Sequence, residues 1–418
     1  MLFGGLHRVS WYHWRLEVSR NALLENKCAL GLVRIGPGVP SLLFDLWLAG
    51  LRLIGPRGGS RALPIMPRNS PFLISRTLAV LFWAAVCFEL MSSSAGEVPL
   101  QLTPAPSARV VTVSDPNATD AFKARPEVVR AMVDRAITNF THQPSVAAAW
   151  LSLVSTQDVI GIKVYSMPGP NVGTRTAVVA GVIEGLLQAG VPPKHIVIWD
   201  KQPTELRQAN YYDLGERLGV RVEASAQAGY DLTNFYDSPI IGNLVWGDVE
   251  FGQKAQGVGR RSYISKLVSR EITKIINITP LLNHNLAGVS GNLFSLVSGS
   301  VDNFARFELD SSRLATAVPE IYALPSLSDR VVLNIVDALI CQYEGEERGR
   351  FHYSATLNEL RLSKDPVALD VLSLQELDRQ RALAKAPEVK SNLDLYGNAT
   401  LLELGVNDLK RIEVEHVP

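Results

Sequence analysis

The chain has 418 residues, of which 47% are hydrophobic and 20% are charged, and its formal net charge at pH 7 is +0. A neutral chain creates no overall positive field, so its charge does not favour nucleic acid as a partner. The cysteines Cys28, Cys87 and Cys341 are far apart in the sequence, which argues against an iron–sulfur cluster, a zinc ribbon and a disulfide scaffold.

The first part of the chain, residues 1–65, differs in character from the rest. Basic side chains there outnumber acidic ones, tryptophans are interspersed, and Gly-Pro steps interrupt any helix. No clean hydrophobic period runs through it. We therefore expect residues 1–65 to be a non-globular extension upstream of the true start at Met66. An amphipathic N-terminal domain or membrane anchor is the alternative.

The next segment, residues 66–95, has the layout of a secretory signal. Basic residues precede an apolar run over residues 78–88, and the small residues Ser93 and Ala95 follow as a cleavage site. The run is about eleven residues long, short of the roughly 20 that a membrane span needs. We therefore predict export to the periplasm or the extracellular space, with transient membrane contact through this segment. The alternative is a membrane anchor formed by residues 78–88.

A Pro- and Ser-rich linker, residues 97–107, leads into the predicted folded part, residues 108–418. Strand and helix patterns alternate there, which predicts βαβ units and an α/β fold. We expect a mixed, mostly parallel sheet flanked by helices, in one lobe or two. The expected strands are 109–113, 158–165, 195–199, 220–223, 271–278, 331–336, 357–362 and 411–414, and the expected helices are 126–140, 174–189, 203–218, 366–381 and 398–404. Residues 231–261 are expected to be an irregular insert and residues 280–307 a polar loop.

A Gly/Pro turn joins the second expected strand to its helix. It contains Lys163, Gly173, Thr174 as an expected N-cap, and Arg175. Free backbone N–H groups and the helix dipole suit a phosphate or carboxylate at such a place, and the two cations add charge. The turn matches neither a Walker loop nor G-x-G-x-x-G, so nucleotide binding is unsupported. An ordinary capped turn is the alternative.

A histidine, His284, sits in a stretch rich in Gly, Ser and Asn. Imidazole is suited to general acid–base work and to metal binding, and the glycines let backbone approach a ligand. No second histidine has the spacing of a zinc motif, so a zinc site is unsupported, and a structural histidine is the alternative. The candidate ligand-binding residues of this stretch are Asn285, Gly288, Gly291, Asp302 and Asn303.

Carboxylates also mark the expected strand ends. Asp337 and Asp200 each follow an apolar strand, where α/β folds bind ligands. Asp365 is explained as the N-cap of the helix that begins at Pro366. Asp370 lies on a largely apolar helix start and would need a partner if buried, and Lys364 is a further candidate for ligand binding.

Seven motifs in this order resemble the uncharacterised family called "domain of unknown function 362". The resemblance spans roughly residues 108–416. In this chain the family's lysine positions near the histidine hold Leu282 and Phe294-Ser295, so part of an anion site could be missing. Some relatives carry ferredoxin-type cysteines, which this chain lacks. The matching pieces are Lys163, Thr174, His284 with Gly288 and Gly291, Asp302-Asn303, Asp337-Ala338, the run from Asp365 to Asp370, and the run from Gly405 to Leu409.

The resemblance supplies a location and no reaction. We expect an exported enzyme that acts on a small anionic or carboxylate ligand at the carboxyl ends of the strands. His284 would be the general base or a metal ligand, Asp337 its orienter or co-ligand, and Lys163 with the Thr174 amide the anion clamp. The alternative is a non-catalytic protein that binds a ligand or metal there. A third reading is an interaction scaffold that uses the insert at residues 231–261.

Overall fold

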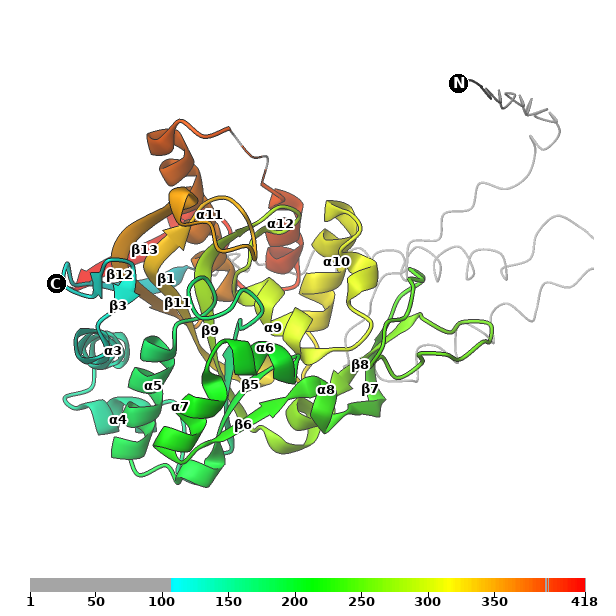
Figure 1. Ribbon diagram of the computed structural model, residues 1–418, viewed down its shortest axis with the longest axis horizontal. Coiled ribbons are helices and arrows are strands. Elements are labelled where there is room, and N and C mark those ends of the chain that lie inside the picture. The colour runs from blue at the N-terminus through cyan, green and yellow to red at the C-terminus, as the bar shows by residue number, and fades with distance from the viewer. Residues whose placement is uncertain (1–106, 388, 390, 418) are drawn as a thin grey trace, which may run out of the picture. The chain divides into compact units, whose positions relative to one another are not determined.

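One mixed sheet organises the computed structural model, which describes residues 107–387, 389 and 391–417. The strand order is β13-β1-β12-β11-β9-β4-β5-β6, with β10 paired to β9 (Figure 1). Only β12 and β10 run antiparallel to their neighbours. The strands are β1 (Ala108–Ser114), β4 (Ile160–Val164), β5 (Ile196–Asp200), β6 (Arg221–Ala224), β9 (Lys274–His284), β10 (Gly288–Val289), β11 (Val331–Gln342), β12 (Ser354–Ser363) and β13 (Ile412–Val417). The predicted α/β class with a mostly parallel sheet is confirmed.

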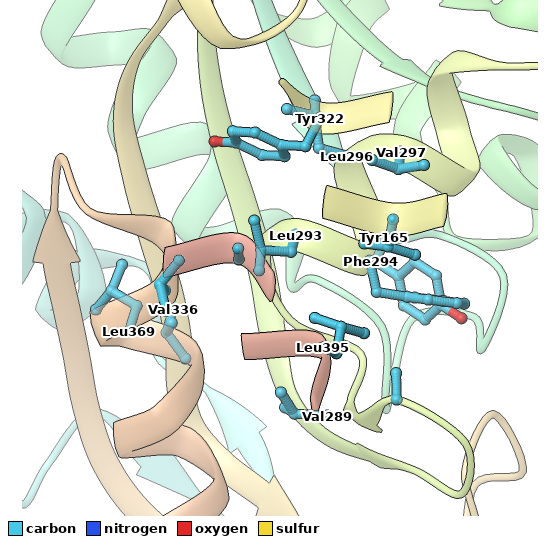
Figure 2. Packing of buried hydrophobic residues seen from close by; sticks show 14 of the residues in the cluster. Tyr165, Val289, Leu293, Phe294, Leu296, Val297, Tyr322, Val336, Leu369 and Leu395 are labelled. Carbon is cyan, nitrogen blue, oxygen red and sulfur yellow. The ribbon is translucent and has the colours of Figure 1, made fainter. Parts of the chain in front are cut away.

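Helices cover both faces of this sheet. One core holds β-branched side chains of the strands against the first helices. The second core holds the opposite faces of the strands against the later helices, and Figure 2 shows part of it. The first layer is α3 (Pro126–Thr141), α4 (Val146–Leu151), α5 (Thr176–Gln188), α6 (Pro203–Gln208) and α7 (Tyr211–Leu218); the second is α9 (Asn292–Ser300), α10 (Ser311–Tyr322), α11 (Pro366–Ala384) and α12 (Leu393–Leu401).

Smaller elements surround this body. The hairpin β2 (Thr119–Asp120) and β3 (Lys123–Ala124) precedes α3, and α8 (Ser225–Ala228) follows β6. The hairpin β7 (Tyr230–Asp237) and β8 (Arg261–Ser265) carries a long loop away from the sheet (Figure 1). Short helices of other types are Pro193–His195, Leu267–Glu271, Ala305–Phe307, Ser328–Arg330, Phe351–Tyr353 and Leu409–Arg411.

Strand periodicity decides which side chain meets which helix layer. In β4, the residues Ile160, Ile162 and Val164 belong to the core under α5, so the intervening Lys163 points to the α9 face. The chain leaves β4 through α5 on one face and leaves β9 through α9 on the other. Crossovers that depart to opposite faces create a topological switch point between β4 and β9, where doubly wound folds bind ligands.

Three local expectations were wrong, each for a physical reason. The expected helix 203–218 is two helices, because Asn210 takes a left-handed conformation with φ of 63° between them. The expected polar loop 280–307 contains the end of β9 and all of α9, because its small polar residues are buried by packing. The insert expected at 231–261 begins as the regular strand β7.

The N-terminal expectations concern residues outside the described part of the chain. The extension at 1–65, the signal-type segment at 66–95 and nearly all of the linker at 97–107 stay predictions. Within the described residues, no helix combines the length and the apolar character that crossing a bilayer requires.

Candidate functional site

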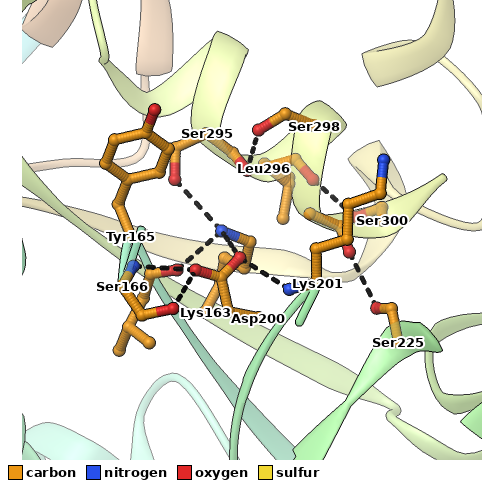
Figure 3. A network of polar contacts seen from close by, with 12 residues as sticks. Lys163, Tyr165, Ser166, Asp200, Lys201, Ser225, Ser295, Leu296, Ser298 and Ser300 are labelled. Carbon is orange, nitrogen blue, oxygen red and sulfur yellow. Dashed lines mark hydrogen bonds and ion pairs between the residues drawn. The ribbon is translucent and has the colours of Figure 1, made fainter. Parts of the chain in front are cut away.

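A fully buried lysine lies at the carboxyl ends of β4 and β5. The Nζ atom of Lys163 is 3.0 Å from Oδ1 of Asp200, and it donates hydrogen bonds to the Val164 carbonyl at 2.7 Å and to Oγ of Ser295 at 3.1 Å. Asp200 in turn accepts from the amide and hydroxyl of Ser166, both at 2.7 Å (Figure 3). Every charged atom of the pair therefore has a protein partner.

Burial lowers the pKa of Lys163, and the attraction of Asp200 opposes that shift. Gly299 of α9 makes the close approach possible. A methyl group at Gly299 would overlap Cε of Lys163 and would lie 2.9 Å from Oδ1 of Asp200. Both side chains are buried. Lys163, which was expected to bind an anion, therefore connects β4 to β5 and to α9 inside the protein.

The turn that follows β4 is fixed on the opposite face. Thr174 Oγ1 accepts from the Tyr165 amide at 3.0 Å and donates to the Ile278 carbonyl at 2.8 Å, so it bridges β4 and β9 at the switch point. The N-cap of α5 is Arg175 and not Thr174. Asp337 is fully buried, accepts from the Arg175 amide at 2.9 Å and pairs with its guanidinium at 3.0 Å.

The same turn needs a glycine. A side chain on Gly173 would lie 2.6 Å from the Tyr165 carbonyl and 2.8 Å from the Gly169 carbonyl. Gly173 therefore has a packing reason for being glycine, in addition to any role toward a ligand.

His284 lies at the end of β9, with its ring 4.3 Å from the Phe294 ring. Its Nδ1 accepts from the amides of Leu286 at 3.2 Å and Ala287 at 3.0 Å, so the neutral ring carries its proton on Nε2. Burial lowers the pKa of His284 to about 4. At neutral pH this geometry favours a hydrogen-bond donor over a general base or a metal ligand, since both of those roles need a free lone pair on Nε2.

The remaining predicted residues occupy separate places. Asp370 is buried and accepts from the amides of Asn292 at 2.7 Å and Leu293 at 3.0 Å, so it caps α9 from α11. Burial raises the pKa of Asp370 to about 7, while those donors oppose the shift. A side chain on Gly291 would overlap this carboxylate. Asp370 thus has the partner that burial demands.

The loop residues of the predicted set also have structural partners. Asp302 accepts from the Tyr263 amide at 2.6 Å and the Val249 amide at 2.8 Å, and Asn303 binds carbonyls of the β7–β8 loop. Gly288 has φ of 91° and packs on Leu374. The backbone amide of Asn285 donates a hydrogen bond to the carboxylate of Glu346. Lys364 is exposed.

Half-buried charges gather at the carboxyl edge near β5. Tyr165 donates to Glu347 at 2.7 Å. Burial, with repulsion from Asp200, raises the pKa of Glu205 to about 7, and burial lowers the pKa of Lys201. With a pKa near 7, Glu205 can exchange a proton near neutrality. Among the described residues, no three His, Cys, Asp or Glu side chains are arranged to hold a metal ion.

A basic pocket lies on the other face, beside the start of α5. Its volume is about 300 Å³, and its lining contains four cations and one carboxylate. The cations come from β3, α3, the N-cap of α5 and α7. They are Lys123, Arg130, Arg175 and Arg217, and the carboxylate is Glu184.

The structure divides the predicted residues among several sites. Thr174, Arg175 and Asp337 are together, as are Gly291 and Asp370, but His284 has no hydrogen bond or ion pair to Lys163 or Asp337 in the described chain. Their proposed roles toward a ligand stay predictions. Of the whole set only Arg175 lines the basic pocket. The other three cations were missed, because single basic residues on separate elements, the strand β3 and the helices α3 and α7, form no pattern in the sequence.

Replacement of Gly299 by alanine should lower the free energy of unfolding by about 2 to 4 kcal/mol, because it forces the buried ion pair apart. Urea denaturation measures the change. The control is Gly397→Ala in α12, where an added methyl meets nothing within 4 Å and should raise stability by roughly 0.5 to 1 kcal/mol. A Gly299→Ala protein as stable as wild type would contradict the role given to the pair.

His284 should make the protein sensitive to acid. A folded pKa of about 4, below the ordinary value of 6.5, means that the unfolded chain binds the proton first as pH falls. The free energy of unfolding should therefore drop by about 3 kcal/mol between pH 6.5 and 4 relative to a His284→Asn variant, which keeps an acceptor but cannot be charged. Denaturant titrations across this range test it. His142→Asn, at an exposed position, is the control, and equal acid slopes for wild type and His284→Asn would refute the assignment.

No curated protein matches the chain. A crystal structure of a Thermotoga maritima protein aligns with a TM-score of 0.35 and 10% identity, over 64% of this chain and 60% of that one. The chain therefore spans about 60% of that protein's length. The family described as "Domain of unknown function (DUF362)" matches residues 160–375, from the start of β4 into α11 and over more than half of the sequence. The chain belongs to the DUF362 family.

Proposed function

We propose that this protein binds a small anionic ligand in the basic pocket beside the start of α5. The observation that carries the proposal is the lining charge, four cations against one carboxylate around a volume of about 300 Å³. Pockets of this size hold small metabolites, and a surplus of cations with low-dielectric walls attracts anions from solution.

Two of the four cations are free to bind. Arg130 is shared between Asp134 at 3.0 Å and Glu184 at 2.5 Å, and Arg175 is held by Asp337. Lys123 and Arg217 are exposed and have no ion pair within the described residues. The paired arginines thus supply a fixed wall, and the free pair supplies the charge that a ligand can neutralise.

The start of α5 adds donors to the same pocket. Its first residues, Thr176 and Ala177, line the pocket, and the N-cap Arg175 provides no side-chain cap for the helix. First-turn amides have no intrahelical acceptor, and the helix dipole favours negative charge there. The anion expected at this turn from the sequence is therefore supported on the α3 face of the sheet. His284 and Lys163 lie outside the lining, which supports binding more than catalysis.

Charge removal from the pocket should weaken anion binding. An Arg217→Ala variant is expected to bind inorganic phosphate or acetate about tenfold more weakly than wild type, because one charge-assisted hydrogen bond is lost. Arg217→Lys should recover part of the affinity, and added salt should weaken binding to wild type. Calorimetric titration of the full chain measures the dissociation constants.

The matched control for this test is Lys194→Ala, since Lys194 is an exposed lysine outside the pocket. It should bind both anions as wild type does. Equal affinities for wild type and Arg217→Ala, or no measurable affinity of wild type for either anion, would refute the pocket as an anion site.

Export is the second part of the proposal, and the signal-type pattern of residues 66–95 supports it. Cleavage after Ala95 would leave a mature chain that begins at Gly96. Mass spectrometry of the N-terminal peptide from protein purified from its native source tests this. A native protein that still begins at Met1 or Met66 would contradict export by signal cleavage.

A further inference from the structure

The hairpin β2–β3 reaches the basic pocket through a strained turn. Its two central residues, Ala121 and Phe122, have φ of 48° and 64°, the left-handed region that two-residue hairpins of type I′ require. Asn-Gly and related pairs are preferred there, because a side chain with Cβ is disfavoured at positive φ. A phenylalanine at such a position persists only when the surroundings determine the turn.

The surroundings of this turn do determine it. Thr119 donates to Oδ1 of Asn358 at 2.6 Å, the Arg125 amide donates to the Ala118 carbonyl at 2.8 Å, and Arg125 pairs with Asp120 at 3.1 Å. The hairpin is therefore tied to β12 on one side and to the start of α3 on the other. These ties hold the strained conformation without using the phenyl ring.

The ring of Phe122 is presented to the pocket. It is 41% exposed, it is part of the pocket lining beside Lys123, and its centroid is 5.7 Å from that of Phe351. The contact with Phe351 covers only part of this ring, so a large apolar side chain in a strained turn is left half-exposed beside Lys123. An apolar ring in a ligand would cover it.

We infer that the anion bound in this pocket carries an aromatic ring, which stacks on Phe122 while its charged group lies against Lys123, Arg217 and the first amides of α5. This inference rests on the proposed anion site and names its ligand class as aryl phosphates or aryl carboxylates. The volume of about 300 Å³ suits one ring with one charged group, since it is at the small end of ligand pockets.

The test compares probes that differ only in the ring. The wild-type full chain should bind phenyl phosphate about fivefold more tightly than methyl phosphate, and benzoate more tightly than acetate. Stacking of the ligand's ring on Phe122 is expected to increase the affinity by about this factor. Phe122→Gly and Phe122→Ala should lose this preference, so that each binds phenyl phosphate and methyl phosphate with equal affinity. Calorimetric titration supplies all of these ratios.

Thermal stability separates a ligand role from a structural one. Phe122→Gly relieves the strain of positive φ and should raise the melting temperature by about 2 °C while it abolishes the aryl preference. A phenylalanine retained for packing alone would show the reverse, a lower melting temperature and unchanged affinities. The control is Phe251→Ala, an exposed ring on the β7–β8 loop, which should keep the preference.

The possible results are distinct. Equal affinities of wild type for phenyl and methyl phosphate, or a preference that survives Phe122→Gly, would overturn the aryl inference and leave the anion site standing. Failure of wild type to bind any of the four probes would overturn the anion site and the aryl inference together.

Discussion

The carboxyl edge of the sheet depends on one buried ion pair, Lys163 with Asp200. Removing two charges from water costs several kcal/mol per ion, and their attraction offsets this cost only when the remaining hydrogen-bonding groups are satisfied. Here hydroxyls of Ser166 and Ser295 and nearby backbone groups complete the coordination. The pair therefore joins β4, β5 and α9 and requires a glycine, Gly299, where the helix passes it. The ion pair thus explains two residues of α9, the hydroxyl residue Ser295 and the glycine at 299.

A second buried ion pair, Arg175 with Asp337, joins a helix to a strand on the opposite face of the sheet. It fixes the first turn of α5 against β11, so the orientation of the amides at the start of the helix is fixed as well. Because Arg175 is paired with Asp337, its charge is not available to a ligand, but the pair makes the wall of the pocket rigid. The charge available to an anion comes from Lys123 and Arg217, which are exposed and form no ion pair within the part of the chain that the structure describes. Preorganised walls with free cations reduce the ordering cost of binding.

The two buried pairs place Lys163 and Asp337, which were expected in one site, on opposite faces of the sheet. Lys163 lies near the end of β4, but Asp337 lies in the middle of β11, because that strand continues to Gln342 and does not end at residue 336 as expected. Successive residues of a strand point to opposite faces, and here Lys163 faces α9 whereas Asp337 faces α5. Through Asn277 of β9, Lys163 is level with Asn334, and Asp337 lies an odd number of residues further along β11, which turns its side chain to the other face. This register depends on pairing between strands far apart in the chain. The tautomer of His284 could not be predicted from the sequence either, because it is set by the amides of Leu286 and Ala287, which the turn after β9 brings near the ring.

By itself the sequence determined the local features. Alternating strand and helix patterns predicted a mostly parallel sheet, and Asp365 with Pro366 predicted the start of α11, whose cap the structure confirms. These signals are local, because apolar period and capping act within a few residues. Only the tertiary structure decided that the ring of Phe122 and the exposed cations Lys123 and Arg217 meet at the start of α5. Their meeting results from packing between distant segments, which leaves no pattern in the order of residues.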